Sequence, residues 1–186
     1  TDLKIASLLE GQLAETFSKP LIMVVVCPLN HLVRQWDKEL KGLGASPIVV
    51  AEGKKKWESD LRSMLDAFAS GELAFLPIVI SNASLMSKAF QRVLASFPST
   101  TLIIADEVHN LGAKRLFDSL PETPAYRLGL SATPERWLDP DGTARIHDYF
   151  GEVVMRFSLQ DALDGGYLCP YLYHPVLVTL EADEHE

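Results

Sequence analysis

Hydrophobic positions along the chain fall into two patterns, short continuous runs and longer stripes at helical spacing. The runs indicate strands that are covered on both faces of a sheet. They lie at 21–27, 47–51, 77–80, 101–105 and 127–130. The stripes indicate amphipathic helices. They lie at 1–17, 31–43, 57–68, 85–97, 114–120 and 145–150. Strands that alternate with such helices predict a doubly wound or related parallel α/β fold.

The last part of the chain carries a weaker pattern. Residues 153–157 are expected to be extended, and Ser158 can cap a small helix that ends at Gly165 and Gly166. Residues 171–180 also read as extended, but Pro175 interrupts them, which favours an edge strand or a linker. We therefore expect one domain over residues 1–170 and an exit strand or linker at 171–186.

The strand predicted at 101–105 ends in two adjacent carboxylates, Asp106 and Glu107. Open parallel sheets bind ligands at the carboxyl ends of their strands, so both side chains are candidates for a nucleotide site. There Asp106 would hold a magnesium ion beside the phosphates, with waters between. Glu107 would polarise a water against the terminal phosphate. The competing interpretation is an acidic turn after a buried strand, because such short matches recur by chance.

Composition limits the partners and the compartment. A formal net charge of -8 argues against a protein that is basic all over, but nucleic-acid binding needs only a local face. The two cysteines, Cys27 and Cys169, have no paired spacing, which predicts reduced thiols and not zinc ligands. The apolar run at 21–27 is too short to span a bilayer, and no secretory leader opens the chain. We expect a cytoplasmic or nucleoid-associated protein with no membrane partner.

Three ordered stretches resemble the first motor domain of a superfamily-two DExH-box helicase or translocase, which has a RecA-like fold. Residues 24–36, Val-Val-Val-Cys-Pro-Leu-Asn-His-Leu-Val-Arg-Gln-Trp, resemble motif Ia. Asp-Glu-Val-His at 106–109 resembles motif II, and Ser-Ala-Thr-Pro at 131–134 resembles motif III. Residues 81–85 resemble motif Ib, and 157–171 resemble the exit from this domain in DNA-repair and type III restriction-like members.

The resemblance implies a P-loop NTPase fold, a parallel sheet flanked by helices, and ATP and Mg²⁺ as cofactors. It implies that Asp106 and Glu107 act on magnesium and water, and that His109 reaches toward the phosphates and motif III. Within motif III, Ser131, Ala132 and Thr133 would relay the state of motif II. A histidine after a strand is otherwise more often a satisfied structural residue, and Ser or Thr before Pro commonly forms a turn.

DNA is the nucleic acid that the resemblance implies, lying across the turns that follow the other strands. Small polar groups and amides there can bind phosphates without reading sequence. The candidates are Pro28, Asn30, Gln35, Ser81, Asn82 and Ser84. Helix packing competes with this role for Gln35 and is the preferred interpretation for Trp36. The sequence leaves Arg136, Trp137 and Arg145 open between a partner-facing and a DNA-facing loop.

One part of the family pattern is missing. These motors need a Gly-rich loop that ends in Gly-Lys-Thr and cradles the phosphates, and the chain contains none. We expect Thr1 to be the last residue of that loop in a longer protein, which also carries a second RecA-like domain. In that case the intact protein is an ATP hydrolase and this piece alone is inactive. The alternatives are a non-catalytic RecA-like module that binds DNA or a partner, and an RNA helicase domain.

Overall fold

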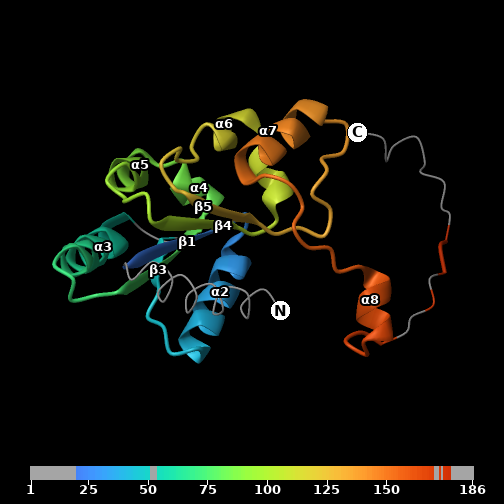
Figure 1. Ribbon diagram of the computed structural model, residues 1–186, viewed down its shortest axis with the longest axis horizontal. Helices are drawn as coiled ribbons and strands as arrows, with labels where there is room; N and C mark the ends of the chain where they lie inside the picture. Colours follow the sequence, from blue (N-terminus) through green and yellow to red (C-terminus); the bar gives the residue numbers. More distant parts are fainter. Residues whose placement is uncertain (1–19, 51–53, 170–171, 173, 177–186) are drawn as a thin grey trace, which may run out of the picture. The chain divides into compact units, whose positions relative to one another are not determined.

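The computed structural model describes residues 20–50, 54–169, 172 and 174–176 (Figure 1). The helix expected at 1–17, the phosphate-loop role of Thr1 and most of the exit strand expected at 171–180 lie outside the described residues. The chain divides into two compact units after Gly151. The predicted boundary after residue 170 stays a prediction.

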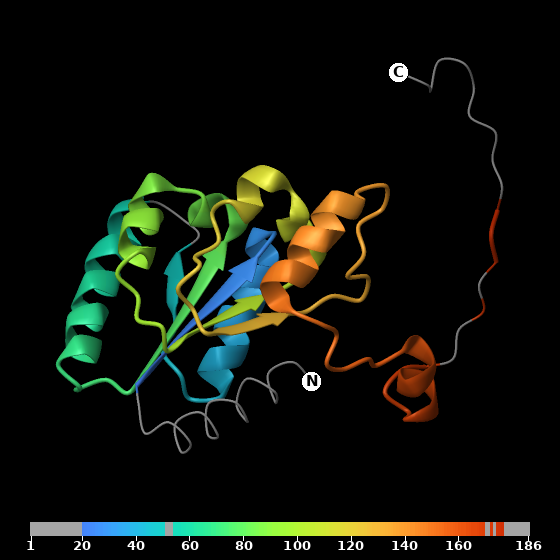
Figure 2. The same ribbon diagram turned by 45° about the horizontal axis from the view of Figure 1, so that its top comes forward.

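A five-stranded sheet forms the centre of the first unit, and all its strands run parallel (Figure 2). The strand order is β2-β3-β1-β4-β5. The strands are β1 (Leu21–Cys27), β2 (Ile48–Val50), β3 (Phe75–Ser81), β4 (Thr101–Ala105) and β5 (Tyr126–Gly129). All five predicted strands are present, and the predicted fold class, a parallel sheet flanked by helices, is confirmed.

The helices of the first unit connect these strands. They are α2 (Asn30–Gly42), α3 (Lys54–Ala69), α4 (Asn82–Leu85), α5 (Lys88–Leu94), the 3₁₀ helix η1 (Val108–Gly112), α6 (Lys114–Phe117) and α7 (Pro140–Phe150). Helix α2 lies on one side of the sheet, and α3, α4 and α5 lie on the other (Figures 1 and 2).

Some predicted helix bounds were wrong, and capping residues explain the larger differences. The single helix predicted at 85–97 is two helices, because Ser87 starts α5 by accepting a hydrogen bond from the Phe90 N–H. Ser81 caps α4 in the same way, by accepting from the Ser84 N–H. The helix predicted at 145–150 starts earlier, since Asp139 caps α7 and Pro140 occupies its first turn. The helix predicted at 114–120 ends at Phe117.

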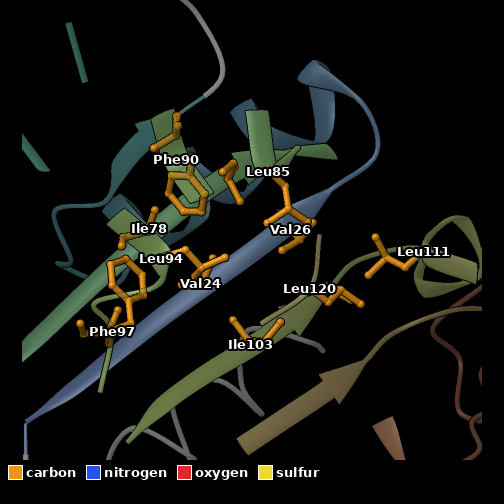
Figure 3. Packing of buried hydrophobic residues seen from close by; sticks show 14 of the residues in the cluster. Val24, Val26, Ile78, Leu85, Phe90, Leu94, Phe97, Ile103, Leu111 and Leu120 are labelled. Carbon is orange, nitrogen blue, oxygen red and sulfur yellow. The ribbon is translucent and has the colours of Figure 1, made fainter. Parts of the chain in front are cut away.

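Two hydrophobic clusters bury the sheet, one on each face. Alternate residues of a strand point to opposite faces, so Val24 and Val26 enter one cluster, and Met23, Val25 and Cys27 enter the other. The first cluster packs beneath α4 and α5, and Figure 3 shows Val24 and Val26 among Leu85, Phe90, Leu94 and Phe97. The second is closed by Val33, Trp36 and Leu40 of α2. With every residue of β1 buried, the central strand is a rigid platform for the loops at its carboxyl end.

The second unit contains the short helix α8 (Leu159–Asp164). Ser158 caps it as predicted: the Ser158 hydroxyl accepts from the Asp161 N–H at 3.1 Å, and the Asp161 carboxylate accepts from the Ser158 N–H at 2.7 Å. Residues 153–157 form no strand within the described part of this unit. Among the described helices of both units, none has the length and apolar character needed to cross a membrane.

Candidate functional site

The carboxyl ends of four strands meet at one edge of the sheet. Cys27 of β1 is paired with Ser81 of β3, and Ala105 of β4 is paired with Gly129 of β5. The turns that follow these strands, which carry most of the predicted site residues, therefore leave from the same edge. The turn after β4 is tied to both neighbours: the Asp106 N–H donates to the Val26 carbonyl, and the Val108 N–H donates to the Leu130 carbonyl, each at 2.9 Å.

Asp106 follows directly on β4 and is partly exposed. Its Oδ2 accepts a hydrogen bond of 2.9 Å from the indole Nε1–H of Trp36. Within the described part of the chain, no lysine or arginine pairs with Asp106 or with Glu107. A carboxylate that is fixed through one oxygen and keeps the other for a ligand suits Mg²⁺, which prefers oxygen donors and keeps several of its waters.

Glu107 occupies a strained backbone position at the start of η1. Its φ of 48° lies in the left-handed region, which costs a residue with a β-carbon roughly 1–2 kcal/mol. The side chain is 42% exposed, and its Oε2 lies 3.4 Å from Nδ1 of His109. Strain of this kind persists where the surrounding structure holds it, often at functional sites. Because its side chain is exposed, the Glu107 carboxylate is available to a bound molecule at the edge of the sheet.

His109 links the turn after β4 to the turn after β5. Its Nδ1 lies 3.0 Å from the Ser131 hydroxyl, and its Nε2 lies 3.2 Å from Nδ2 of Asn110. Because the Asn110 amide nitrogen is only a donor, a neutral His109 accepts at Nε2 and carries its proton on Nδ1, where it donates to Ser131. The Ser131 hydroxyl also accepts from the Thr133 N–H at 3.1 Å. Ala132 and Thr133 are exposed.

Two arginines that the sequence left undecided point inward, onto the carbonyls of η1. The Arg136 guanidinium donates to the His109 carbonyl and, at 2.7 Å, to Asp139. Nη2 of Arg145 donates to the Gly112 carbonyl at 2.7 Å. The hydrogen bond from Arg136 lowers the pKa of Asp139 below its usual value. A β-carbon on Gly112 would meet the Arg136 side chain and would lie 2.8 Å from the Gly142 carbonyl oxygen, so this close approach requires glycine.

Trp137 and Cys27, which lie beside Arg136 and Asp106 respectively, differ sharply in exposure. Trp137, which follows Arg136, is 89% exposed. Cys27 lies at the end of β1, fully buried, and its burial together with the charge of Asp106 raises the pKa of the thiol to about 12. The thiol is therefore neutral and adds no charge beside the carboxylate.

Of the residues predicted to bind nucleic acid, five are exposed or partly exposed, and Ser81 is buried. Asn30 and Gln35 of α2 are exposed, and Pro28, Asn82 and Ser84 are partly exposed. Ser81 is only 4% exposed, and its hydroxyl accepts from the Ser84 N–H at 3.2 Å. That oxygen stabilises the start of α4. A role for Ser81 at a phosphate stays a prediction, and its most direct form, a hydroxyl facing solvent, is absent.

Sequence reasoning missed the contacts between distant elements. The packing preferred for Trp36 is confirmed, since the ring is 6% exposed in the cluster beneath α2, but its bond to Asp106 was not anticipated. That bond depends on β1 lying beside β4, a strand order that the sequence does not give. No signal in the sequence identified Arg136 or Arg145 as donors to η1.

Known proteins resemble this chain in sequence and in fold. Residues 5–136 match the family model described as type III restriction enzyme, res subunit. The chain is 30% identical over 165 residues to the DNA 3'-5' translocase XPB2 of Sulfurisphaera tokodaii, covering 87% of this chain and 32% of that protein. It is 33% identical over 90 residues to the type I restriction enzyme EcoAI endonuclease subunit of Escherichia coli, covering 45% of this chain and 10% of that subunit.

The fold also matches a solved structure, a nuclease-deletion mutant of the type ISP restriction-modification enzyme LlaGI in complex with a DNA substrate mimic. The TM-score is 0.63 at 14% sequence identity, covering 85% of this chain and 17% of that one. At this identity the likeness concerns the fold alone. The chain spans 32% of the length of the translocase and 10% of the length of the EcoAI subunit that it matches.

Proposed function

The chain belongs to the family of the type III restriction enzyme res subunit, the RecA-like motor domains of superfamily two, and on that premise we propose that it is the first motor domain of an ATP-driven DNA helicase or translocase. The observation that carries the proposal is the turn after β4. Asp106 and Glu107 stand partly exposed at the carboxyl end of a parallel strand, and neither pairs with a lysine or an arginine among the described residues. This turn is motif II in the proposal.

The two carboxylates would do different work at a bound nucleotide. Asp106 would hold Mg²⁺, which when bound shields the charge that develops on the phosphates. The carboxylate of Glu107 would accept a hydrogen bond from the attacking water and take up its proton. Thr1 would close the phosphate-binding loop, whose Gly and Lys would precede it in the intact protein.

His109 would transmit a structural change at this site to motif III. The bond between His109 and the Ser131 hydroxyl joins the turn after β4 to residues 131–133. A shift of Glu107 on loss of the terminal phosphate would reach Ser131 through the imidazole, since both side chains lie near Nδ1 of His109. Ala132 and Thr133 would carry the shift toward the second RecA-like domain, because both are exposed.

DNA is the proposed track, along the edge formed by the turns after β1 and β3. Exposed Asn30 and Gln35, with the partly exposed residues Pro28, Asn82 and Ser84, offer amides and small polar groups to phosphates. The name of one relative, 30% identical, includes DNA translocase. This relative favours DNA over RNA. Comparison of DNA and RNA as stimulators of ATP turnover decides between them.

The proposal is tested by Glu107→Gln in the full-length protein that carries this chain. Removal of a general base lowers turnover by about 10²–10⁴-fold, while nucleotide binding survives. Asp118→Asn is a matched control, because it also removes one carboxylate charge and Asp118 pairs with exposed Lys114 of α6. ATP turnover in Glu107→Gln equal to that of the control would overturn the proposal.

The main alternative is a non-catalytic RecA-like module, which would explain the missing phosphate loop by loss. The gene sequence upstream of Thr1 separates it from the motor. A Gly-Lys pair immediately before Thr1 supports the motor, and a start codon at that position supports the module.

A further inference from the structure

Trp36 connects two parts of the molecule that are far apart in sequence. The indole Nε1–H donates to Oδ2 of Asp106 at 2.9 Å, across 70 positions of the chain. The ring belongs to α2, and it is 6% exposed within the hydrophobic cluster that α2 forms against the sheet. Within the described residues, the Asp106 side chain accepts its hydrogen bond from this indole. The carboxylate at the end of β4 is thus held by α2, the helix that covers one face of the sheet.

We propose that Trp36 is a positioning residue, which sets the orientation of the Asp106 carboxylate for the magnesium ion. The inference rests on the proposed function, in which Asp106 holds that ion. An aspartate side chain on a turn rotates freely about its last bond unless one oxygen is fixed. A hydrogen bond to a charged acceptor is about twice as strong as a neutral one, so the indole is an effective restraint.

The chemistry of the indole suits this task. Its N–H is only a donor, so it satisfies one oxygen of Asp106 and cannot itself compete as a ligand for a cation. The ring belongs to the same buried cluster as Met23 and Val25 of β1 and Leu40 of α2, so it cannot turn away without opening the core. The second oxygen of Asp106 then faces one direction.

A structural role is the competing explanation, since buried indoles usually find a hydrogen-bond partner. The chain offers a matched control for that explanation. Trp57 on α3 is also 6% exposed, and it packs edge-on against Phe90 in the cluster on the other face of the sheet. Trp36→Phe and Trp57→Phe remove the same atoms from two buried sites, and only the first touches an acidic residue of the site.

The first measurement is the Mg²⁺ concentration that gives half-maximal ATP turnover, at saturating ATP, in the full-length protein. We expect Trp36→Phe to raise it about tenfold, as loss of one charge-assisted hydrogen bond implies. Trp57→Phe is expected to leave it unchanged. Equal values for the two variants would overturn the inference. Normal ATP turnover by Glu107→Gln would overturn the proposed function. Equal Mg²⁺ values with impaired turnover by Glu107→Gln would overturn only the role of Trp36.

The second measurement needs no turnover, and it is made on the wild-type protein. The wild-type protein is labelled with 5-fluorotryptophan, and ¹⁹F NMR spectra are recorded with ADP before and after Mg²⁺ is added. Signals are assigned by the loss of one peak in each Trp→Phe variant, or by single-site incorporation if Trp36→Phe fails to fold. The Trp36 signal is expected to shift, and those of Trp57 and of exposed Trp137 to stay. A Trp36 signal that stays in place overturns the inference.

Discussion

Two polar turns leave the same edge of the sheet and use their side chains in opposite ways. After β3, Ser81 bonds to Ser84, three residues on. After β4, Asp106 bonds to Trp36 and His109 bonds to Ser131, 70 and 22 positions away. Short-range bonds build the next helix, whereas long-range bonds fix a side chain against other elements. Short polar side chains at a sheet edge therefore do not by themselves distinguish a helix start from a binding site.

Backbone conformation explains the difference. Ser81 has extended dihedral angles and accepts from the N–H of Ser84, so its hydroxyl is satisfied locally. The turn after β4 passes through left-handed Glu107 and makes no side-chain cap at the start of η1. The Asp106 carboxylate bonds to α2, and the His109 imidazole bonds to Ser131 after β5. The turn after β4 should thus be sensitive to changes far away in sequence, and the turn after β3 should not.

The largest effect is expected for Arg136→Ala. The variant leaves the His109 carbonyl without the guanidinium and removes a side chain that is only 23% exposed. The free energy of unfolding should fall by roughly 2 kcal/mol, because bonds to charged groups contribute about 1.5–3 kcal/mol. Chemical denaturation measures it. Arg115→Ala, at an exposed position of α6, is the control, and equal stability of the two variants would contradict the account.

A smaller effect is expected for the bond between His109 and Ser131. In a double-mutant cycle, His109→Ala and Ser131→Ala should be coupled by about 1 kcal/mol in the free energy of unfolding, as one hydrogen bond implies. Thr133→Ala replaces Ser131→Ala in the control cycle, because Thr133 is exposed and contributes its backbone N–H to Ser131. Coupling in the control cycle as large as in the first would show that the bond is not what joins the two turns.

The turn after β3 is tested by removing its cap. Ser81→Ala should lower the free energy of unfolding by about 1 kcal/mol, and Ser87→Ala, at the start of α5, should do the same. Both variants should bind DNA with the affinity of the wild type, since both hydroxyls serve the backbone. Fluorescence anisotropy with a labelled oligonucleotide measures that affinity. Weaker DNA binding by Ser81→Ala alone would instead indicate that the Ser81 hydroxyl contacts a DNA phosphate.

The smallest expected effect concerns Cys27, which lies between the two turns. Only a thiolate reacts with iodoacetamide, and the pKa of about 12 keeps the Cys27 thiol protonated at pH 8. Cys169 is exposed, so it should be labelled while Cys27 is not. Peptide mass spectrometry after brief labelling of the folded protein measures both. Comparable labelling of the two cysteines would show that the end of β1 opens readily to solvent.

The same division between local and distant bonds separates what the sequence predicts from what it does not. All five strands were predictable, because burial on both faces leaves continuous apolar runs such as 21–27. The position of Asp106 and Glu107 at the edge follows from that pattern. The division of 85–97 into two helices depended on a single capping serine, Ser87, within an otherwise continuous apolar stripe.

The partners of the site residues could not be predicted in the same way. Trp36 lies at a core position of α2, so its sequence position predicts only packing. The placement of β1 next to β4 brings its N–H to Asp106. Arg136 and Arg145 donate to backbone carbonyls of η1, and a carbonyl is present at every residue. Such contacts leave no mark on residue type, so they appear only once the chain is folded.

The central claim is that the adjacent carboxylates of the turn after β4 perform separate tasks at a nucleotide. The most direct test measures ADP affinity with and without Mg²⁺ in the full-length protein, for Asp106→Asn and for Glu107→Gln. The account predicts that Asp106→Asn loses the increase in affinity that Mg²⁺ gives, and that Glu107→Gln keeps it while losing ATP turnover. An unchanged effect of Mg²⁺ in Asp106→Asn would contradict it.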